Sequence, residues 1–448
     1  MKTCVVREAD EGAGDGQCHR HRNDLSPGAL DFSAAGHLYA THQLHAFAAR
    51  LPPPLAEWAI NTFTDPGDHV LDVMCGSGTT LVEAVLTGRI GHGVDIDPLA
   101  RLIAMAKATP ITPEDVLTLI ARIEEAFEGD LDDSWRPDLP RLDYWFRSDV
   151  SADLARIKSA ILATTSDDAV RRLAWVVFSS LIVARTSVAN AKDLVHSRHH
   201  YEQRKENPDT VARFMRQLRR AARLMDEFGK RLDGVDWHHA RLAGNDARAM
   251  SVGSELMDLV FFSPPYVSAL DYPRAHVFAV AWLADVLSTS VNQYRAHARD
   301  YVGTDRAPLA EATAGQPMPP ASGYTVVDEV VQDLAESPAK AWVVYRYFRD
   351  MTHVLSECAR VTRPGGHVVV VVCPSNIRRI HVPTHQIFAA IAPQLSDGLL
   401  EAEVVYERTI HDRRRVMPYL EKAFGERMRT EYVVVLRRTP RRTLGRPE

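Results

Sequence analysis

The stretch His69-Val-Leu-Asp-Val-Met-Cys-Gly-Ser-Gly-Thr-Thr80 decides the fold class of this chain. Its first part, His69–Met74, is apolar and predicts a β-strand, and its end opens a predicted helix over Thr79–Thr87. The two glycines in between allow a tight backbone turn and a close approach to a ligand. The start of the helix offers that ligand free backbone N–H groups. A candidate ligand site therefore lies at the carboxyl end of this strand.

The residues around the glycines exclude two phosphate-binding motifs. Leu81 stands where a dinucleotide-binding G-x-G-x-x-G motif needs its third glycine. No Gly-Lys-Ser/Thr follows either, so the turn is not a P-loop. The remaining pattern is an acid at the strand end, Asp72, followed by a glycine turn that lacks a pyrophosphate-binding motif.

A second acidic motif, Gly93-Val-Asp-Ile-Asp-Pro98, follows the predicted strand Ile90–Val94. Strand, glycine turn, helix and strand within about 30 residues indicate a parallel βαβ unit. An acid about 20 residues after the glycines can accept hydrogen bonds from vicinal ribose hydroxyls. Asp95 is the better candidate, because Asp97 precedes a proline and can cap the next helix. The alternative is that both acids are helix caps.

A third motif, Gly244-Asn-Asp-Ala-Arg248, follows a strand predicted over residues 237–243. Asp246 can accept a hydrogen bond from an adenine amino group. An Asn-Asp turn is also common without any ligand.

The apolar strand Met257–Phe262 ends in the fourth motif, Ser263-Pro264-Pro265-Tyr266. Two prolines stop the strand ladder and fix a rigid turn. An exocyclic amine on a base ring is a poor nucleophile, and two fixed acceptors, the Ser263 hydroxyl and the Pro264 carbonyl, can direct its lone pair at an electrophilic methyl group. The Tyr266 ring can stack on the base and hold it out of the helix. The alternative is a purely structural turn.

Together these motifs resemble the S-adenosylmethionine-dependent amino-methyltransferases that modify N4 of cytosine or N6 of adenine in DNA. The segment His45–Pro52 resembles the part of that family that helps close the cofactor pocket, and Arg363–Gly366 resembles a later part of its fold. The resemblance assigns cofactor-binding roles to Asp72, Met74, Cys75, Gly76, Gly78, Thr79, Thr80, Asp95, Ile96, Asp246 and Ala247. It assigns catalytic roles to Ser263, Pro264, Pro265 and Tyr266.

The resemblance implies an α/β fold, with a Rossmann-like class I methyltransferase sheet, helices on both faces and a large helical insertion. Serine at the first position of Ser-Pro-Pro-Tyr favours N4 of cytosine in that family, whereas Asp or Asn favours N6 of adenine. We therefore expect a DNA (cytosine-N4)-methyltransferase that uses S-adenosylmethionine on a flipped base of double-stranded DNA, with a cognate restriction endonuclease as a candidate partner. The alternatives are N6-adenine methylation, an RNA or small-molecule substrate, and a non-enzymatic nucleic-acid-binding subunit.

The order of the segments departs from the family in one respect, because a long helical stretch separates the ribose and adenine motifs. It is the candidate target-recognition lobe. The predicted organisation is a flexible arm over 1–36, a cofactor half over 37–110, a helical insertion over 111–235, a catalytic half over 236–437 and a basic tail over 438–448. Further predictions are helices over 114–127, 151–164, 168–185, 210–231, 275–287 and, in two pieces, 326–361, a strand over 367–373, and an antiparallel strand pair, 401–408 and 431–437, at the sheet edge.

The overall composition sets limits on the class of protein. The chain has 448 residues, 46% hydrophobic and 25% charged, which is typical of a soluble protein. Five cysteines are too few for a disulfide scaffold, which favours a reducing, cytoplasmic location. No apolar run reaches the roughly 18–20 residues of a membrane span, and the first residues lack the apolar core of a signal peptide. Cys18, His19 and His21 match no standard zinc spacing, so no metal is predicted.

The formal net charge of −5 argues against a uniformly basic surface, but basic residues are concentrated locally. Between Arg198 and Arg231 there are ten Lys or Arg against five Asp or Glu. Phosphate contacts need such local patches and not a positive total. Candidate nucleic-acid contacts are Arg198, Arg216, Arg219, Arg220, Arg413 and Arg414. A solvated helix face with ordinary ion pairs explains the helix over 210–231 equally well.

Overall fold

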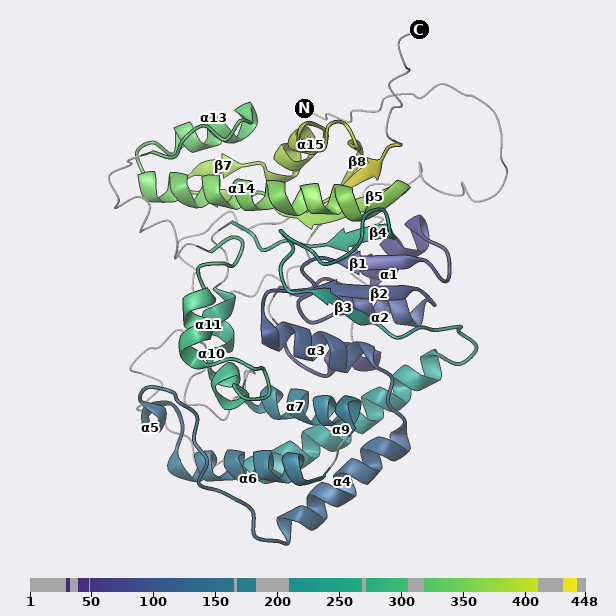
Figure 1. Cartoon of the computed structure of the whole chain (residues 1–448), viewed down its shortest axis with the longest axis vertical. Helices are drawn as coiled ribbons and strands as arrows, with labels where there is room; N and C mark the ends of the chain where they lie inside the picture. The colour runs from purple at the N-terminus through teal and green to yellow at the C-terminus, as the bar shows by residue number, and fades with distance from the viewer. Residues whose placement is uncertain are drawn as a thin grey trace.

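The structure is a computed structural model that describes residues 30–32, 39–47, 49–164, 167–182, 209–267, 271–304, 318–409 and 430–440 (Figure 1). Its centre is a seven-stranded sheet in the order β3-β2-β1-β4-β5-β9-β8. The strands are β1 His69–Asp72, β2 Ile90–Val94, β3 Arg241–Gly244, β4 Met257–Phe262, β5 Thr362–Val372, β8 Leu400–Thr409 and β9 Thr430–Arg438.

The direction in which strands are added reverses beside β1, which pairs with β2 on one side and with β4 on the other. The five strands β1 to β5 are all parallel, whereas β9 is antiparallel to both β5 and β8. This topology confirms the predicted Rossmann-like α/β fold and the predicted antiparallel pair at the sheet edge. In such sheets ligands bind outside the carboxyl ends of the strands at the reversal point.

Central strand β4 is buried on both faces, as a strand of a covered parallel sheet must be. Leu259 and Phe261 belong to an apolar cluster with α1 (Pro53–Phe63). Val260 and Phe262 point to the opposite face and belong to a cluster with α13 (Thr325–Asp333), α14 (Pro338–Val361) and α15 (Thr384–Leu395). The alternation follows from the two-residue period of a strand and confirms that helices cover both faces.

The helices on the second face include the two pieces expected over residues 326–361, which are α13 (Thr325–Asp333) and α14 (Pro338–Val361). Elements without a clear sequence signal are η1 Ala40–Gln43, α5 Leu142–Trp145, α11 Val291–His297, α15 Thr384–Leu395, β6 Ser375–Ile377 and β7 Ile380–Val382. The remaining helices of the sheet region are α2 Thr79–Leu86, α3 Pro98–Ala108 and α10 Tyr272–Trp282.

The helical stretch between β2 and β3 forms a lobe at the opposite end of the molecule from α13–α15 (Figure 1). Its long helices are α4 Pro113–Phe127, α6 Ser148–Thr164, α7 Asp168–Ile182 and α9 Thr210–Arg231. One apolar cluster runs through these helices and also through α2, α3 and α10. Phe146, for example, is fully buried against Phe278 and Trp282 of α10. The lobe and the cofactor half therefore share one core.

Three predicted boundaries are shifted for local reasons. Helix α10 begins at Tyr272, ahead of the predicted 275, because the Asp271 side chain accepts from the Arg274 N–H and caps it. Strand β5 begins at Thr362, ahead of the predicted 367, because Thr362 pairs with Met257 and the ladder then shifts register. Strand β3 begins only at Arg241, where its pairing with β2 starts.

Several predictions fall on residues outside the described ranges. They include most of the arm over 1–36 with Cys18, His19 and His21, and most of the tail over 438–448. Among the described residues, no helix is both long and apolar enough to cross a membrane. The same residues contain no group of three or more His, Cys, Asp or Glu side chains arranged to hold a metal ion.

Candidate active site

A cavity of about 880 Å³, counted with its open mouth, lies at the carboxyl ends of β1, β2 and β4. This is the position that the strand reversal predicts. Of the sequence-predicted residues, the cavity is lined by Asp72, Met74, Cys75, Gly76, Thr79, Asp95, Ile96, Asp246, Ala247, Ser263 and Pro265. Gly78, Thr80, Pro264 and Tyr266 are not in its wall. The motifs of both halves of the chain thus meet at one cavity.

The glycine turn is held by Asp72, which is almost completely buried. Its carboxylate accepts from the Thr80 hydroxyl at 2.5 Å and from the Met74 N–H at 3.1 Å. Burial raises the pKa of Asp72 to about 7, although both hydrogen bonds act in the opposite direction. Thr80 therefore acts from behind the cavity wall, by fixing the acid at the end of β1.

Gly78 is needed for packing as well as for its backbone conformation. Its φ is +80°, a region that residues with a side chain rarely adopt. A Cβ at this position would also lie 2.7 Å from the Cα of Ala104 in α3. The second glycine of the motif thus lets α3 pack directly against the start of α2.

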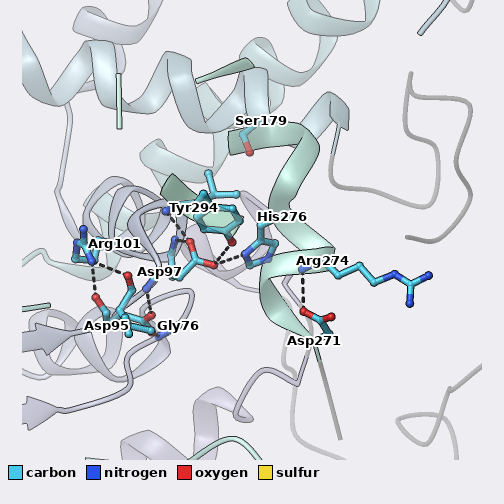
Figure 2. Close-up of polar contacts among 12 residues, drawn as sticks. Gly76, Asp95, Asp97, Arg101, Ser179, Asp271, Arg274, His276 and Tyr294 are labelled. Carbon is cyan, nitrogen blue, oxygen red and sulfur yellow. Dashed lines mark hydrogen bonds and ion pairs between the residues drawn. The ribbon is translucent and has the colours of Figure 1, made fainter. Parts of the chain in front are cut away.

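Asp95 joins the acidic motif to the glycine turn, as Figure 2 shows. One carboxylate oxygen accepts from the Gly76 N–H at 2.8 Å, and the other accepts from the Asp97 N–H at 2.8 Å. Each oxygen retains a second lone pair, so both can still accept a hydroxyl from a ligand in the cavity. Burial, reinforced by the nearby Asp97 carboxylate, raises the pKa of Asp95 to about 6.

Asp97 caps α3, as predicted, but it also has partners that the sequence did not indicate. One oxygen accepts from the Leu99 N–H at 2.8 Å, while the other lies 2.7 Å from Nδ1 of His276 and accepts from the Tyr294 hydroxyl at 2.9 Å (Figure 2). Both partners are buried. Although burial opposes it, the pKa of Asp97 lies below its ordinary value because of His276 and the hydrogen bonds. Helices α10 and α11 are thereby attached to the loop that carries Asp95.

An aromatic wall covers the glycine turn from the segment before α1. The ring of Phe47 would lie 3.1 Å from a Cβ added at Gly76, and its centroid is 6.1 Å from that of Tyr272 and 5.1 Å from that of His276. Ala49, Arg50 and Leu51 of the same segment also line the cavity. The structure therefore places part of the segment 45–52 where the family resemblance expected it.

In the third motif, the Asp246 carboxylate is held by Arg248 two residues later. Arg248 donates to it from Nε at 3.0 Å and from Nη2 at 2.8 Å. A second ion pair, at 3.5 Å, links Arg248 to the buried Asp350 of α14. This chain of charges fixes Asp246 and Arg248 at the cavity wall.

The Ser-Pro-Pro-Tyr turn is divided between the cavity and the protein interior. Ser263 and Pro265 line the cavity, whereas Pro264 is buried. The hydroxyl of Tyr266 points toward β9, where it donates to the Glu431 carboxylate at 3.0 Å. Burial, together with the Glu431 charge, raises the pKa of Tyr266 well above its ordinary value.

Other cavity residues had no signal in the sequence. Asp300, Tyr301 and Val302 lie in the wall, after α11 and outside any motif. His276 and Tyr294 approach the site only because their helices pack beside the acidic loop. No local pattern could have identified them, since each sits in an otherwise ordinary helix.

The described candidate nucleic-acid residues lie on α9. Arg216 is exposed, Arg219 forms an ion pair with Glu124 of α4, and Arg220 donates to the side chain of Gln43 at 3.1 Å. Two of these three guanidinium groups therefore already have partners within the protein. Arg198, Arg413 and Arg414 lie outside the described residues.

The sequence resembles a known protein family and two known methyltransferases. A family model of the N6/N4 methyltransferase type, described as DNA methylase, matches residues 20–105. The type II methyltransferase M.MvaI of Kocuria varians is 24% identical over 384 residues, which cover 78% of this chain and 80% of that protein. The type II methyltransferase M.MjaII of Methanocaldococcus jannaschii is 36% identical over 66 residues, covering 15% of this chain and 12% of that protein.

Solved structures of methyltransferases also resemble the chain, at low similarity. A SAM-dependent methyltransferase from Methanosarcina mazei has a TM-score of 0.29 and 10% identity, covering 85% of this chain and 96% of that one. The rRNA methyltransferase aviRa from Streptomyces viridochromogenes has a TM-score of 0.31 and 13% identity, with 88% of each chain covered. Because these scores are low, the fold assignment rests on the strand order of the sheet itself.

The cavity has the chemistry that S-adenosylmethionine requires. Asp95 offers carboxylate lone pairs for ribose hydroxyls, and Phe47, Ile96 and Ala247 provide apolar surface for an adenine ring. The glycine turn at the start of α2 brings backbone close to the space between them. The methylase match over residues 20–105 and the methyltransferase relative along most of the length support an S-adenosylmethionine-dependent amino-methyltransferase of the N6/N4 type.

Proposed function

We propose that this enzyme methylates N4 of cytosine in double-stranded DNA. The observation that carries the proposal is the position of Ser263. It directly follows β4 and lines the same cavity as Asp95 and Met74. Serine at this position favours N4 of cytosine in the family that the motif resembles. The type II methyltransferase relative supports DNA as the substrate. A cognate restriction endonuclease stays a prediction from the sequence.

The proposed reaction is a direct in-line transfer to a base that is flipped into the cavity, at a cost of a few kcal/mol. Ser263 and the Pro264 carbonyl accept the two N–H groups of the amine, which directs its lone pair at the methyl group. S-adenosylmethionine supplies that methyl group on a sulfonium that is already a good leaving group. The nitrogen–carbon bond forms as the carbon–sulfur bond breaks, and the amine then loses a proton. Positioning and electrostatics carry the rate.

The described cysteines support amine chemistry over methylation at C5 of cytosine, which needs a thiolate nucleophile. Cys75, Cys358 and Cys373 are all buried. Burial raises the pKa of each of the two thiols, Cys75 and Cys373, above the ordinary value of a cysteine. Both thiols therefore stay protonated near neutral pH.

The modified base identifies the function. In cells that express the enzyme, nucleoside mass spectrometry of the DNA is expected to detect N4-methylcytosine, and cells expressing Ser263→Ala serve as the control. Detection of N6-methyladenine in place of N4-methylcytosine would show that the target base is adenine and not cytosine. A mark found only in RNA, or no mark in either nucleic acid, would reject DNA methylation in favour of an RNA substrate or a non-enzymatic role.

A contact between α9 and DNA phosphates is tested by salt dependence. Each phosphate contact contributes about 0.9 to the slope of log affinity against log salt. The triple variant Arg216→Gln, Arg219→Gln and Arg220→Gln is expected to lower that slope by about 2, because Arg219 is paired with Glu124, whereas Arg216 is exposed and Arg220 has only the neutral side chain of Gln43 as its partner. The control removes three other charges of the lobe, with Arg136→Gln, Arg156→Gln and Arg171→Gln. If the wild type and the α9 variant have the same slope, α9 does not contact the DNA phosphates.

A further inference from the structure

We propose that Glu431 is a positioning residue for Tyr266 and holds its ring in the orientation that stacks on the flipped base. The inference rests on the proposed function, because it takes the stacking role of Tyr266 as given. It adds the strand pair β8–β9, on the far side of β5, to the catalytic machinery. No motif of the sequence includes Glu431.

The phenol group of Tyr266 has a partner on each side. Its hydroxyl donates to Oε1 of Glu431 at 3.0 Å, and its oxygen accepts from the thiol of Cys373 at 3.3 Å. The Tyr266 hydroxyl therefore serves as donor and as acceptor at once. A ring tethered at its para position can no longer swing freely about its side-chain bonds.

Glu431 is itself fixed by a buried cation. Its other oxygen, Oε2, lies 2.8 Å from a guanidinium nitrogen of Arg408, whose side chain is only 2% exposed. The two residues are directly opposite each other in the antiparallel ladder of β8 and β9. A buried charge needs a compensating partner, so Arg408 stabilises Glu431 as a carboxylate. That carboxylate keeps one oxygen for the Tyr266 hydroxyl.

The tether spans the sheet beside the cavity. Tyr266 follows β4, Cys373 follows β5, and Glu431 and Arg408 belong to β9 and β8. These four strands are consecutive neighbours in the sheet. The rigid Pro264-Pro265 pair fixes the backbone of the turn from one side, and the tether fixes the tip of the tyrosine from the other. A base that arrives between them meets a preformed platform.

The test compares two variants and their combination in the purified full chain. Tyr266→Phe removes only the hydroxyl, and Glu431→Gln removes the charge with little change in volume. Tritium transfer from labelled S-adenosylmethionine to unmethylated bacteriophage DNA gives kcat and KM, and calorimetry gives the cofactor affinity. Each single variant is expected to lower kcat about 10-fold, because small misplacements at a reacting centre have large effects on rate. The cofactor affinity should stay within about twofold.

The double variant separates positioning from general damage. If both residues act through one hydrogen bond, Tyr266→Phe with Glu431→Gln lowers kcat no further than either single change does. Tyr432→Phe, the next residue on β9, is the matched control and is expected to keep wild-type kcat. Additive losses in the double variant, or an equal loss in the control, overturn the proposal.

The outcomes also separate this inference from the proposed function. Wild-type kcat in Tyr266→Phe, combined with loss of activity in Tyr266→Ala, overturns the tether and leaves the stacking role intact. Wild-type kcat in both variants rejects the stacking role as well. If Glu431→Gln fails to fold because Arg408 is left uncompensated, Tyr266→Phe alone decides, since it leaves that ion pair in place.

Discussion

Replacing Tyr266 with alanine is expected to lower turnover about 100-fold, while S-adenosylmethionine binds within about twofold of its wild-type affinity. Stacking of a base on an aromatic ring contributes about 1–3 kcal/mol, and each 1.4 kcal/mol corresponds to a factor of ten. Without the stacking ring, the base is no longer held with its amine aligned at Ser263. The cofactor affinity is spared because Tyr266 is not in the cavity wall.

The measurements are single-turnover methyl transfer to DNA and calorimetric titration with the cofactor. Tyr345→Ala is a suitable control, because Tyr345 is a half-buried tyrosine of α14 that does not line the cavity. If Tyr266→Ala methylates DNA at the wild-type rate, the ring does not hold the base. A parallel loss of cofactor binding would instead indicate that the whole turn has collapsed.

Replacing Asp95 with alanine is expected to weaken S-adenosylmethionine binding about 10- to 100-fold. Hydrogen bonds to a charged group contribute about 1.5–3 kcal/mol each, and Asp95 is placed to accept from ribose hydroxyls. The substitution also leaves the Gly76 and Asp97 N–H groups without their acceptor, which loosens the glycine turn. Both effects act on the cofactor and not on DNA.

Calorimetry on the Asp95→Ala and Asp95→Asn variants measures the loss of cofactor affinity. Asparagine keeps one acceptor oxygen but places an amide N–H₂ against one of the two backbone donors, so its loss should be nearly as large. Asp130→Ala, at an exposed position on the lobe, controls for unspecific effects. Unchanged affinity in Asp95→Ala would move the ribose contact to another group, and Asp97 is already occupied by His276 and Tyr294.

Much of the cofactor half could be predicted because its signals are local. Three features lie within 24 residues of one another: the strand end at Asp72, the two glycines and the acid at position 95. The position of each is set by the local backbone conformation. Gly78 is required by its positive φ and by its contact with Ala104. The prolines after β4 terminate that strand by rules that need no tertiary information.

The polar partners of these residues could not be predicted in the same way. Tyr266 and Glu431 are 165 positions apart, and Asp97 and His276 are 179 apart. Arg219 looked like a candidate phosphate contact by sequence, yet the packing of α9 against α4 brings Glu124 to it. The shared core of the lobe and α10 likewise follows from how the helices pack and not from any single motif.

The sequence by itself determined the parallel βαβ unit and the turns at the strand ends, because these depend on backbone conformations that neighbouring residues impose. The tertiary structure alone decided which buried charges meet. A buried carboxylate or guanidinium must find a partner to offset the loss of water, and that partner is whichever group the packed strands and helices bring within reach. For this reason Asp97 binds His276 and Tyr294, and Glu431 joins Arg408 to Tyr266.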